Sequence, residues 1–368
     1  MSSPELALFR RFPEARDRLP HHAFLTGPTP VAPLTLSDGS LPAGRVFVKR
    51  DERSCPVYGG NKPRKLEFVI GRARAAGAHR LVTTGGLGTH HGLATLLLGR
   101  EAGFATTLVL VDQPVTDAVR ASLRLFARYG AEVVHARSVP GAVLATAAAL
   151  ARAAARGERP RRVPTGGSGP LGNLGFVSAG LELAEQVAAG LLPAPAELYV
   201  AVGSGGTAAG LHVGLGLGGL GTRLVPVLVT DILPPSPRRL ARAAAATWRR
   251  LARAVPRLPR VAIGPGDFRL ARRQLGPGYG AATPAAREAR AAARAAGLSL
   301  ETTYTAKCLA ELRQRAREGA LAPGAILFWN TFSAVDVAAR APRPFDPRDL
   351  PPSLARLAET APTALEDA

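Results

Sequence analysis

The sequence predicts an α/β protein of two domains, in which helices cover mostly parallel sheets. Two observations support this prediction. The chain has 368 residues, more than a single hydrophobic core usually serves, so two domains are expected. From residue 61 to about 135, alanine-rich helical stretches alternate with short β-branched runs, which is typical of parallel strands joined by helices.

Glycines mark the ends of the helical stretches in this region. Gly77, Gly103 and Gly130 each stand a few residues before an apolar run. A glycine just after a helix readily adopts the left-handed conformation that leads the chain into the next strand. The strands expected from this punctuation are 81–84, 107–111 and 132–135.

Further strands are expected at RVFVKRD (45–51) and at the apolar runs 198–202, 224–230 and 326–328. A helix is predicted over 283–296, because Thr283 is a suitable N-cap and Pro284 suits the first helical position. The chain beyond about Pro342 is rich in proline, and a tail or a short terminal helix is expected there.

The composition argues against several classes of protein. No run approaches the roughly 20 apolar residues of a membrane span, and the N-terminus lacks the pattern of a secretory signal, so a cytoplasmic protein is expected. Cys55 and Cys308 are too few for a disulfide framework and lack the spacing of a zinc site, so two reduced thiols are expected.

The formal net charge is +20, which raises the possibility of a nucleic-acid partner. The excess is nearly all arginine scattered through the chain, without the interleaved aromatic residues on which bases stack. The stretch 236–260 is predicted to form a basic amphipathic helix with a solvated face. Neither nucleic acid nor a membrane is therefore expected as a partner.

The segment GGNKPRKLEF (59–68) contains the first candidate for chemistry, Lys62. It lies early in a predicted helix, where the positive end of the helix dipole and the neighbouring Arg64 and Lys65 favour a neutral amine. A neutral lysine is a nucleophile. By itself, the segment also fits a lysine that is simply solvated.

A strand, a glycine-rich loop and a helix follow one another in ELYVAVGSGGTAAGL (197–211). Backbone N–H groups of such a loop converge on a phosphate, and hydroxyl groups at the helix start add donors. The loop consists of Gly203, Ser204, Gly205, Gly206 and Thr207. A nicotinamide dinucleotide is one candidate ligand, since Asp231 stands where a ribose-binding acid is expected. Pyridoxal 5′-phosphate (PLP) explains both the loop and Lys62, because it needs a phosphate cradle and an amine.

Six segments resemble, in order along the chain, the motifs of one family. They are GGNKPRKLEF (59–68), GGLGTHHG (85–92), VPTGGSGPLGNLGF (163–176), VGSGGTAAG (202–210), GYG (278–280) and YTAKCLAEL (304–312). The family is that of D-cysteine desulfhydrase and 1-aminocyclopropane-1-carboxylate (ACC) deaminase, among the tryptophan-synthase-like PLP enzymes called fold type II. The resemblance extends from about residue 20 to 340.

The resemblance implies a homodimer of chains with two three-layer α/β domains. Residues 1–65 and 181–368 are expected to form the large PLP-binding domain, and 66–180 the small one, with the cofactor in the cleft between them. Such clefts are preferred places for ligands.

The resemblance also implies roles for single residues. Lys62 corresponds to the lysine that forms a Schiff base with PLP, with Asn61 as its neighbour, and 203–207 to the phosphate cradle. Tyr279 and Tyr304 correspond to two active-site tyrosines. Thr331 matches the residue that faces the pyridine nitrogen in the desulfhydrase branch, and a hydroxyl there makes the ring a milder electron sink than a carboxylate would.

Two positions distinguish the branches of the family. The deaminase branch reads YEGK at the second tyrosine, whereas this chain reads Tyr304, Thr305, Ala306 and Lys307. The deaminase branch also has leucine in place of Thr331. The chain therefore resembles the desulfhydrase side.

One segment departs from the family. Where the family has Ser-Asn-His or Ser-Asn-Gln, this chain has Thr89, His90 and His91. Thr89 keeps the hydroxyl expected at the substrate carboxylate. His90 takes the place of the asparagine that contacts the cofactor, and His91 is expected near the substrate. Adjacent histidines lack the spacing of a helical metal site, so no metal is expected.

These residues predict a PLP-dependent lyase or deaminase acting on a small amino acid, most like D-cysteine desulfhydrase. Lys62, Thr89, Tyr279 and Tyr304 are the predicted catalytic residues. Lys62 would remove the α-proton, and Tyr279, Tyr304 or His91 would protonate the leaving group. The open alternatives are an ACC deaminase, a dehydratase, a β-replacement enzyme, a nicotinamide oxidoreductase, and a PLP-binding protein without turnover.

Overall fold

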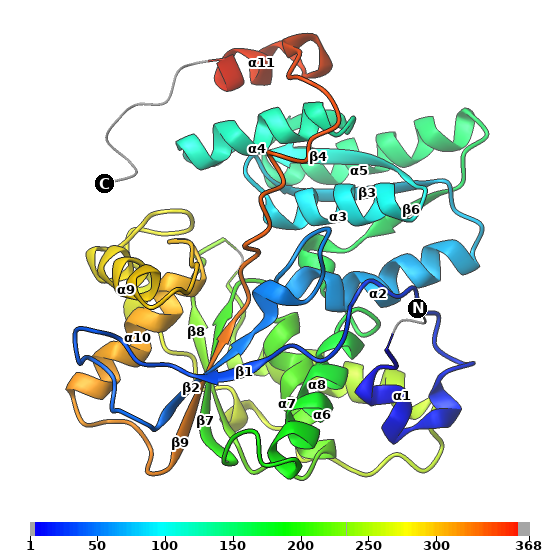
Figure 1. Ribbon diagram of the computed structural model, residues 1–368. Helices are drawn as coiled ribbons and strands as arrows, with labels where there is room; N and C mark the ends of the chain where they lie inside the picture. The colour runs from blue at the N-terminus through cyan, green and yellow to red at the C-terminus, as the bar shows by residue number, and fades with distance from the viewer. Residues whose placement is uncertain (1–3, 233, 360–368) are drawn as a thin grey trace. The chain divides into compact units, whose positions relative to one another are not determined.

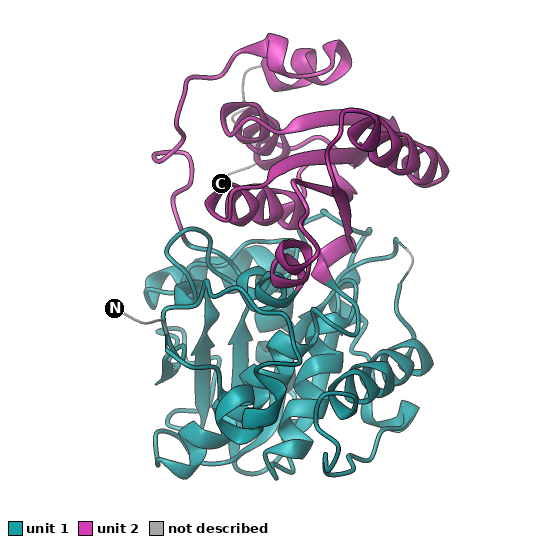
Figure 2. Ribbon diagram, turned by 90° about the vertical axis from the view of Figure 1, so that its right-hand side faces the viewer, with its two compact units in different colours: residues 1–68, 168–334 teal, residues 69–167, 335–368 magenta. Residues whose placement is uncertain are grey.

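The computed structural model describes residues 4–232 and 234–359 (Figure 1). The chain forms two compact units, drawn in teal and magenta in Figure 2. Unit 1 comprises Met1–Phe68 and Ser168–Ala334, and unit 2 comprises Val69–Gly167 and Val335–Ala368. Each unit has a mostly or wholly parallel sheet covered by helices, so the predicted fold class is confirmed.

The units differ in their bounds from the predicted domains 1–65 with 181–368 and 66–180. The helix α6 (Leu174–Ala188) belongs to unit 1, because it packs against α7 (Gly206–Leu217) there. The C-terminal segment belongs to unit 2, where Tyr129 Oη donates to the carbonyl of Val337 at 2.7 Å. The outermost residues of the predicted domains, 1–3 and 360–368, lie outside the described residues.

The sheet of unit 1 has five strands, in the order β1-β2-β9-β7-β8. In spatial order the strands are β1 (Val31–Pro33), β2 (Val46–Arg50), β9 (Ala325–Asn330), β7 (Pro195–Val202) and β8 (Arg223–Leu228). Only the edge strand β1 is antiparallel to its neighbour. The carboxyl ends of the parallel strands therefore share one edge of the sheet, the usual place for a site in such folds.

Helices cover both faces of this sheet (Figure 1). The core on one face contains residues of α6, α7 and α8 (Pro237–Ala252), with α1 (Ala7–Arg11) packed against α6, and the core on the other face contains residues of α9 (Pro284–Ala295) and α10 (Thr305–Arg317). Within β7, Leu198, Val200 and Val202 belong to the first core, and Tyr199 and Ala201 to the second. The alternation follows from the strand's period of two, and both faces of β7 are buried.

Unit 2 contains a four-stranded parallel sheet. Its spatial order is β5 (Glu132–Arg137), β4 (Ala105–Val111), β3 (Arg80–Gly86) and β6 (Pro160–Val163). Its helices are α3 (His90–Glu101), α4 (Asp117–Arg128), α5 (Val139–Ala155) and α11 (Pro352–Glu359), while α2 (Asn61–Ala75) starts in unit 1 and ends in unit 2. Ala142 and Ala149 of α5 pack against Val82 and Val109 of the sheet.

The predicted strands are all present, although β8 ends at Leu228 rather than at residue 230. Gly77, Gly103 and Gly130 have φ of 60°, 82° and 76°, as expected after a helix. Thr283 caps α9 by accepting a hydrogen bond from the backbone N–H of Ala286 at 3.1 Å.

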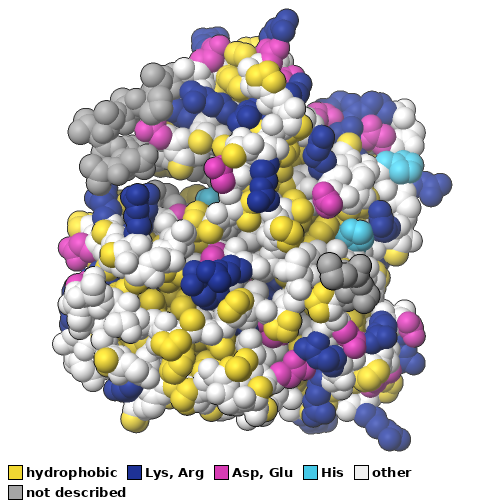
Figure 3. Space-filling view, in the orientation of Figure 1, with side chains coloured by type: hydrophobic (Ala, Val, Ile, Leu, Met, Phe, Trp, Pro, Cys, Tyr) yellow, Lys and Arg dark blue, Asp and Glu magenta, His cyan; other side chains and the backbone are white. Residues whose placement is uncertain are grey.

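Cationic side chains lie in many separate places on the face shown in Figure 3, among acidic and apolar ones. The cations on this face therefore do not gather into one basic patch. Among the described residues, no helix combines the length and the apolar character that a membrane span requires.

Candidate active site

The start of α2 is fixed against the end of β9. Gly60 adopts φ of +80°, and a side chain on it would press against the carbonyl oxygens of Thr331 and Phe332. The backbone N–H of Asn61 donates to the carbonyl of Thr331 at 3.2 Å. A glycine is thus required two residues before Lys62, and the lysine projects from a helix start whose position the sheet determines.

The amine of Lys62 lies within two hydrogen bonds of the glycine-rich loop. Its Nζ donates to Asn61 Oδ1 at 2.8 Å, and Asn61 Nδ2 donates to Thr207 Oγ1 at 3.3 Å. Lys62 is half-buried, and this burial lowers its pKa to about 8, although the carboxylate of Glu301 opposes the shift. A substantial fraction of the amine is therefore neutral and nucleophilic near neutral pH.

The glycine-rich loop follows β7 and opens the twelve-residue helix α7. Gly205 is the N-cap, with φ of +85°, and a Cβ on Gly206 would collide with Ser168 Oγ and Asn173 Oδ1. Ser168 Oγ and Ser204 Oγ are 2.7 Å apart. Hydroxyl groups and helix N–H groups therefore gather where a phosphate would bind.

Lys65 adds an amine to this group of donors. Its side chain is buried, and its Nζ donates to Ser168 Oγ at 3.0 Å. Burial, and then the neighbouring Lys62, hold the pKa of Lys65 well below its ordinary value. A bound phosphate would favour the charged form of this amine.

Tyr279 and Tyr304 are in direct contact. Tyr304 Oη donates to Tyr279 Oη at 2.9 Å, and the two rings meet edge to face with centroids 5.9 Å apart. A Cβ on Gly203 would lie 3.1 Å from Cε1 of Tyr304, so the pair stands beside the glycine-rich loop. Burial raises the pKa of Tyr279, and the hydrogen bond from Tyr304 opposes this rise. The pKa of Tyr304 is raised well above 10 by burial and by the contact with Tyr279.

Glu301 fixes the start of α10, to which Tyr304 is the N-cap. Its carboxylate accepts hydrogen bonds from the backbone N–H groups of Thr303, Tyr304 and Thr305 at 2.7–3.0 Å. The hydroxyl of Thr305 also donates to Glu301 Oε1 at 3.0 Å. Thr305 is thus engaged with the carboxylate that fixes the start of its own helix.

Three predicted residues lie together in unit 2, where β3 leads into α3. Thr89 is the N-cap of α3, and its Oγ1 accepts from the backbone N–H of Gly92 at 3.1 Å. His91 is buried, with Nε2 2.9 Å from Thr83 Oγ1, and His90 is half-buried. The roles of Thr89, His90 and His91 toward a substrate stay predictions.

A buried ionic network supports the start of α2. Arg64, fully buried, donates to Asp51 at 2.8 and 3.0 Å and to Glu182 at 2.9 and 3.0 Å. Lys49 also donates to Glu182, and Trp329 Nε1 donates to Asp51 Oδ2 at 2.7 Å. The network ties α2 to β2, α6 and β9 at once.

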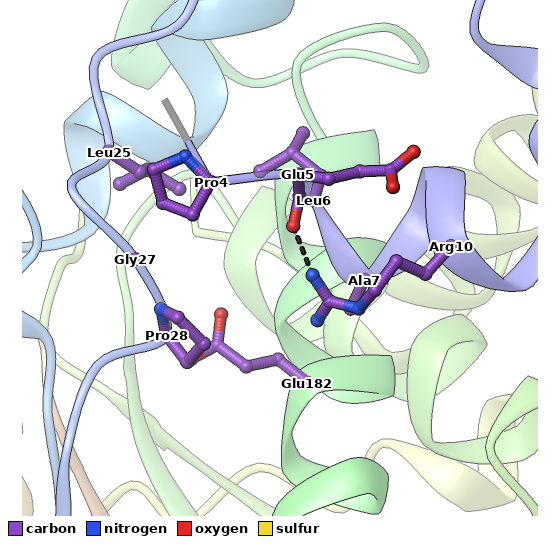
Figure 4. A pocket seen from close by; sticks show the side chains of 9 residues that line it. All are labelled: Pro4, Glu5, Leu6, Ala7, Arg10, Leu25, Gly27, Pro28 and Glu182. Carbon is purple, nitrogen blue, oxygen red and sulfur yellow. Dashed lines mark hydrogen bonds between the residues drawn. The ribbon is translucent and has the colours of Figure 1, made fainter. Parts of the chain in front are cut away.

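A small pocket in unit 1 is lined partly by Glu182 (Figure 4). Most of its wall comes from the N-terminal residues, including Pro4, Leu6 and Arg10. Its volume of about 10 Å³ holds one water molecule at most, so it is too small for a substrate.

The structure brings the site residues predicted in unit 1 together. Lys62, Asn61, Thr207 and Thr331 are linked by hydrogen bonds, and the tyrosine pair lies against Gly203. The donor set fits a small molecule with an anionic group at one end and an aldehyde at the other. The loop and Lys65 would hold the anion, and Lys62 would meet the aldehyde.

Sequence reasoning missed four residues of this site. Lys65 was interpreted only as a neighbouring cation, although its spacing of three from Lys62 on one helix was a signal. Ser168 and Asn173 stand in the quoted motif 163–176 but received no role. Glu301 carries no local signal, because its importance comes from the groups packed around it.

Comparison with known proteins gives consistent results. Residues 23–331 match the family of pyridoxal-phosphate dependent enzymes. The chain is 36% identical over 323 residues to nocardicin C-9′ epimerase of Nocardia uniformis subsp. tsuyamanensis, across 86% of this chain and 93% of that protein. It is 33% identical over 307 residues to D-cysteine desulfhydrase of Salmonella paratyphi C (strain RKS4594), across 80% and 88%.

Solved structures are similar as well. A crystal structure of an ACC deaminase homologue has a TM-score of 0.74 and 25% identity, covering 96% of this chain and 100% of that one. A pyridoxal 5′-phosphate-dependent aspartate racemase, at 18% identity and a TM-score of 0.56, covers 92% and 99% and shares the fold alone.

Proposed function

The chain belongs to the family of pyridoxal-phosphate dependent enzymes, with PLP as cofactor, and it groups with the lyases and deaminases of that family. From this premise we propose that it eliminates a group from Cβ of a small amino acid, most like D-cysteine desulfhydrase. The products would be pyruvate, ammonia and, from cysteine, hydrogen sulfide. The observation that supports the proposal best is the link from Lys62 through Asn61 to Thr207, which joins amine and phosphate cradle.

The residues of unit 1 divide the binding of the cofactor between them. We propose that Ser204, Thr207, Lys65 and the N–H groups at the start of α7 hold the phosphate. Thr331, beside Asn61, would contact the ring nitrogen. When bound, PLP supplies a conjugated ring that stabilises negative charge at the substrate Cα.

Lys62 is the proposed base. After the substrate amine has taken its place, the Lys62 amine removes the α-proton, and its lowered pKa suits a base near neutral pH. Thr89 and the N–H groups at the start of α3 are proposed to bind the substrate carboxylate, which would orient the Cα–H bond.

Tyr279 is the proposed acid for the leaving group. Tyr304 donates a hydrogen bond to Tyr279, so the hydroxyl hydrogen of Tyr279 remains available for another acceptor. The same contact makes Tyr279 the more acidic phenol of the pair. The contact of His91 with Thr83 favours Tyr279 over His91 in this role.

The experiment that tests the function measures three products at once. The purified holoenzyme is given a panel of D- and L-amino acids in D₂O, and ammonia, 2-oxo acid and deuterium at Cα are quantified. Ammonia and pyruvate are expected in equal amounts from an amino acid with a leaving group on Cβ. D- and L-alanine serve as controls, because they have no such group and are expected to exchange the α-proton without releasing ammonia.

A second candidate is epimerisation of an amino-acid centre, favoured by the 36% identity to nocardicin C-9′ epimerase. It would use the same removal of the α-proton by Lys62, followed by reprotonation. Conversion between D and L forms without ammonia would support it and would count against elimination. A holoenzyme that exchanges no α-proton in any amino acid would contradict both.

The attachment of PLP to cofactor-free protein is expected to depend on pH. Only the neutral amine of Lys62 attacks the aldehyde, so the rate should rise as pH approaches about 8 and level off above it. At pH 6 it should be roughly 100-fold below its plateau. Stopped-flow absorbance measures the rate, with N-acetyl-lysine as a control amine that shows no plateau by pH 9. A protein rate that keeps rising to pH 10 would mean an ordinary lysine.

We further propose that the enzyme acts as a homodimer in the cytoplasm and binds neither nucleic acid nor membranes. The resemblance to the family supports the dimer, and the scattered arginines give no reason to expect a polyanionic partner. Light scattering at physiological salt is expected to give twice the mass of the chain.

A further inference from the structure

Tyr279 lies in a loop that is rich in glycine. It follows Gly276, with φ of +64°, and stands between Gly278, at +143°, and Gly280, at +83°. Glycines have the largest conformational freedom to lose, so contacts from other groups contribute to the order of such a loop.

Lys307 and Asp231 supply those groups. Lys307 Nζ donates to the carbonyl of Leu275 at 2.8 Å and to that of Gly278 at 3.3 Å. Asp231 Oδ1 accepts from the backbone N–H of Tyr279 at 2.9 Å. Two residues that precede Tyr279 in the loop are therefore held as well as the tyrosine itself.

The same helix start carries the other phenol. Tyr304 is the N-cap of α10, and Lys307 follows it by three residues. One rigid element thus presents Tyr304 directly and grips the loop of Tyr279 through Lys307. This arrangement accounts for the distance of 2.9 Å between the two phenolic oxygens.

The choice of lysine at this position is informative. The chain has 47 lysines and arginines, of which only Lys49, Lys62, Lys65 and Lys307 are lysines. Arginine is thus the default cation of this sequence. A compact ammonium directs its three donors toward convergent carbonyl oxygens, whereas the planar guanidinium does not fit such a corner.

Burial of this cation has a cost that packing alone does not explain. Lys307 is fully buried, and its ammonium donates to two neutral carbonyl oxygens. Burial lowers the pKa of its amine, and Glu301 and Asp231 oppose that shift. An apolar side chain of similar volume would avoid this desolvation. The benefit of a lysine at this position is therefore the order that its hydrogen bonds give to the loop.

We propose that Lys307, together with Asp231, is a positioning residue that orders the loop 275–280 and aims Tyr279 for proton transfer. The role of Tyr279 as acid rests on the proposed function, whereas the grip on the loop does not. Lys307 itself touches neither substrate nor cofactor in this account.

Hydrogen–deuterium exchange of the holoenzyme tests, independently of turnover, whether Lys307 orders the loop 275–280. In Lys307→Met, the peptide that covers 275–281 is expected to exchange about 10-fold faster or more, while peptides of β7 and α7 keep their rates. Arg317→Met, an exposed cation near the end of the same helix, is the matched control and should leave this peptide unchanged. An unchanged 275–281 peptide in Lys307→Met overturns the proposal.

A double-mutant cycle tests the link to Tyr279. Lys307→Met is expected to lower kcat about 10- to 100-fold, with a smaller effect on KM and full cofactor content. In the Tyr279→Phe background the same substitution should have little further effect, because the tyrosine it positions is gone. Multiplicative losses would overturn the proposal.

A second variant covers the case in which Lys307→Met does not fold. Asp231→Ala changes an exposed side chain and should raise exchange in the same peptide and show the same coupling to Tyr279→Phe. If no amino acid is turned over, the proposed function fails, and the exchange measurement still decides whether the loop is held.

Discussion

Lys62→Ala is expected to abolish turnover and covalent attachment of PLP together. In the proposed function the amine supplies both the link to the cofactor and the base at Cα, so a loss of about 10⁴-fold or more in kcat is expected. The measurements are ammonia release and the borohydride-reducible visible absorbance of the purified variant.

Lys62→Arg is the informative control. It keeps a positive charge of similar reach but has no amine that forms the cofactor link, and it should be as inactive as the alanine variant. Activity of Lys62→Arg within about 10-fold of wild type would show that charge, not nucleophilic chemistry, is needed at this position.

Arg64→Met is expected to cause the largest loss of stability. The substitution leaves the carboxylates of Asp51 and Glu182 buried without their main cation, and breaking such a network costs about 3–5 kcal/mol. Urea unfolding followed by circular dichroism measures the loss. Activity should fall as well, since Arg64 holds the helix that carries Lys62.

Arg10→Ala provides the matched control for this variant. Arg10 of α1 pairs with Glu185, which lies on the same helix as Glu182, α6. Both side chains of this pair are more than a third exposed. An exposed pair of this kind contributes at most about 1 kcal/mol. Equal destabilisation by the two substitutions would contradict the account of the network.

Much of the fold could be predicted from local sequence patterns. Each expected strand is an apolar run that follows a glycine or a loop, and Gly77, Gly103 and Gly130 adopt the positive φ that the pattern requires. The strand β6 was not predicted, because its sequence, PRRV, has two exposed arginines and only one buried apolar residue. Its place in the sheet comes from pairing with β3, which no local pattern reveals.

The same division holds for the site. Lys62, Asn61 and the loop 203–207 were identifiable as candidates because each lies in a contiguous segment with its own chemistry, and their roles toward a cofactor stay predictions. Glu301 and Lys307 were not, since their roles depend on contacts with residues brought near by packing. The C-terminal segment was expected in the large domain but belongs to unit 2. Its place there depends on contacts such as the hydrogen bond from Arg120 to the carbonyl of Leu357, which no local pattern reveals.

Mapping the cofactor link tests the central claim most directly. The holoenzyme is reduced with borohydride and digested, and the peptide that carries the pyridoxyl group is identified by mass spectrometry; with only four lysines in the chain, the assignment is unambiguous. The label is expected on Lys62 alone. A label on Lys65 or Lys307, or a fully loaded enzyme without any label, would contradict that claim.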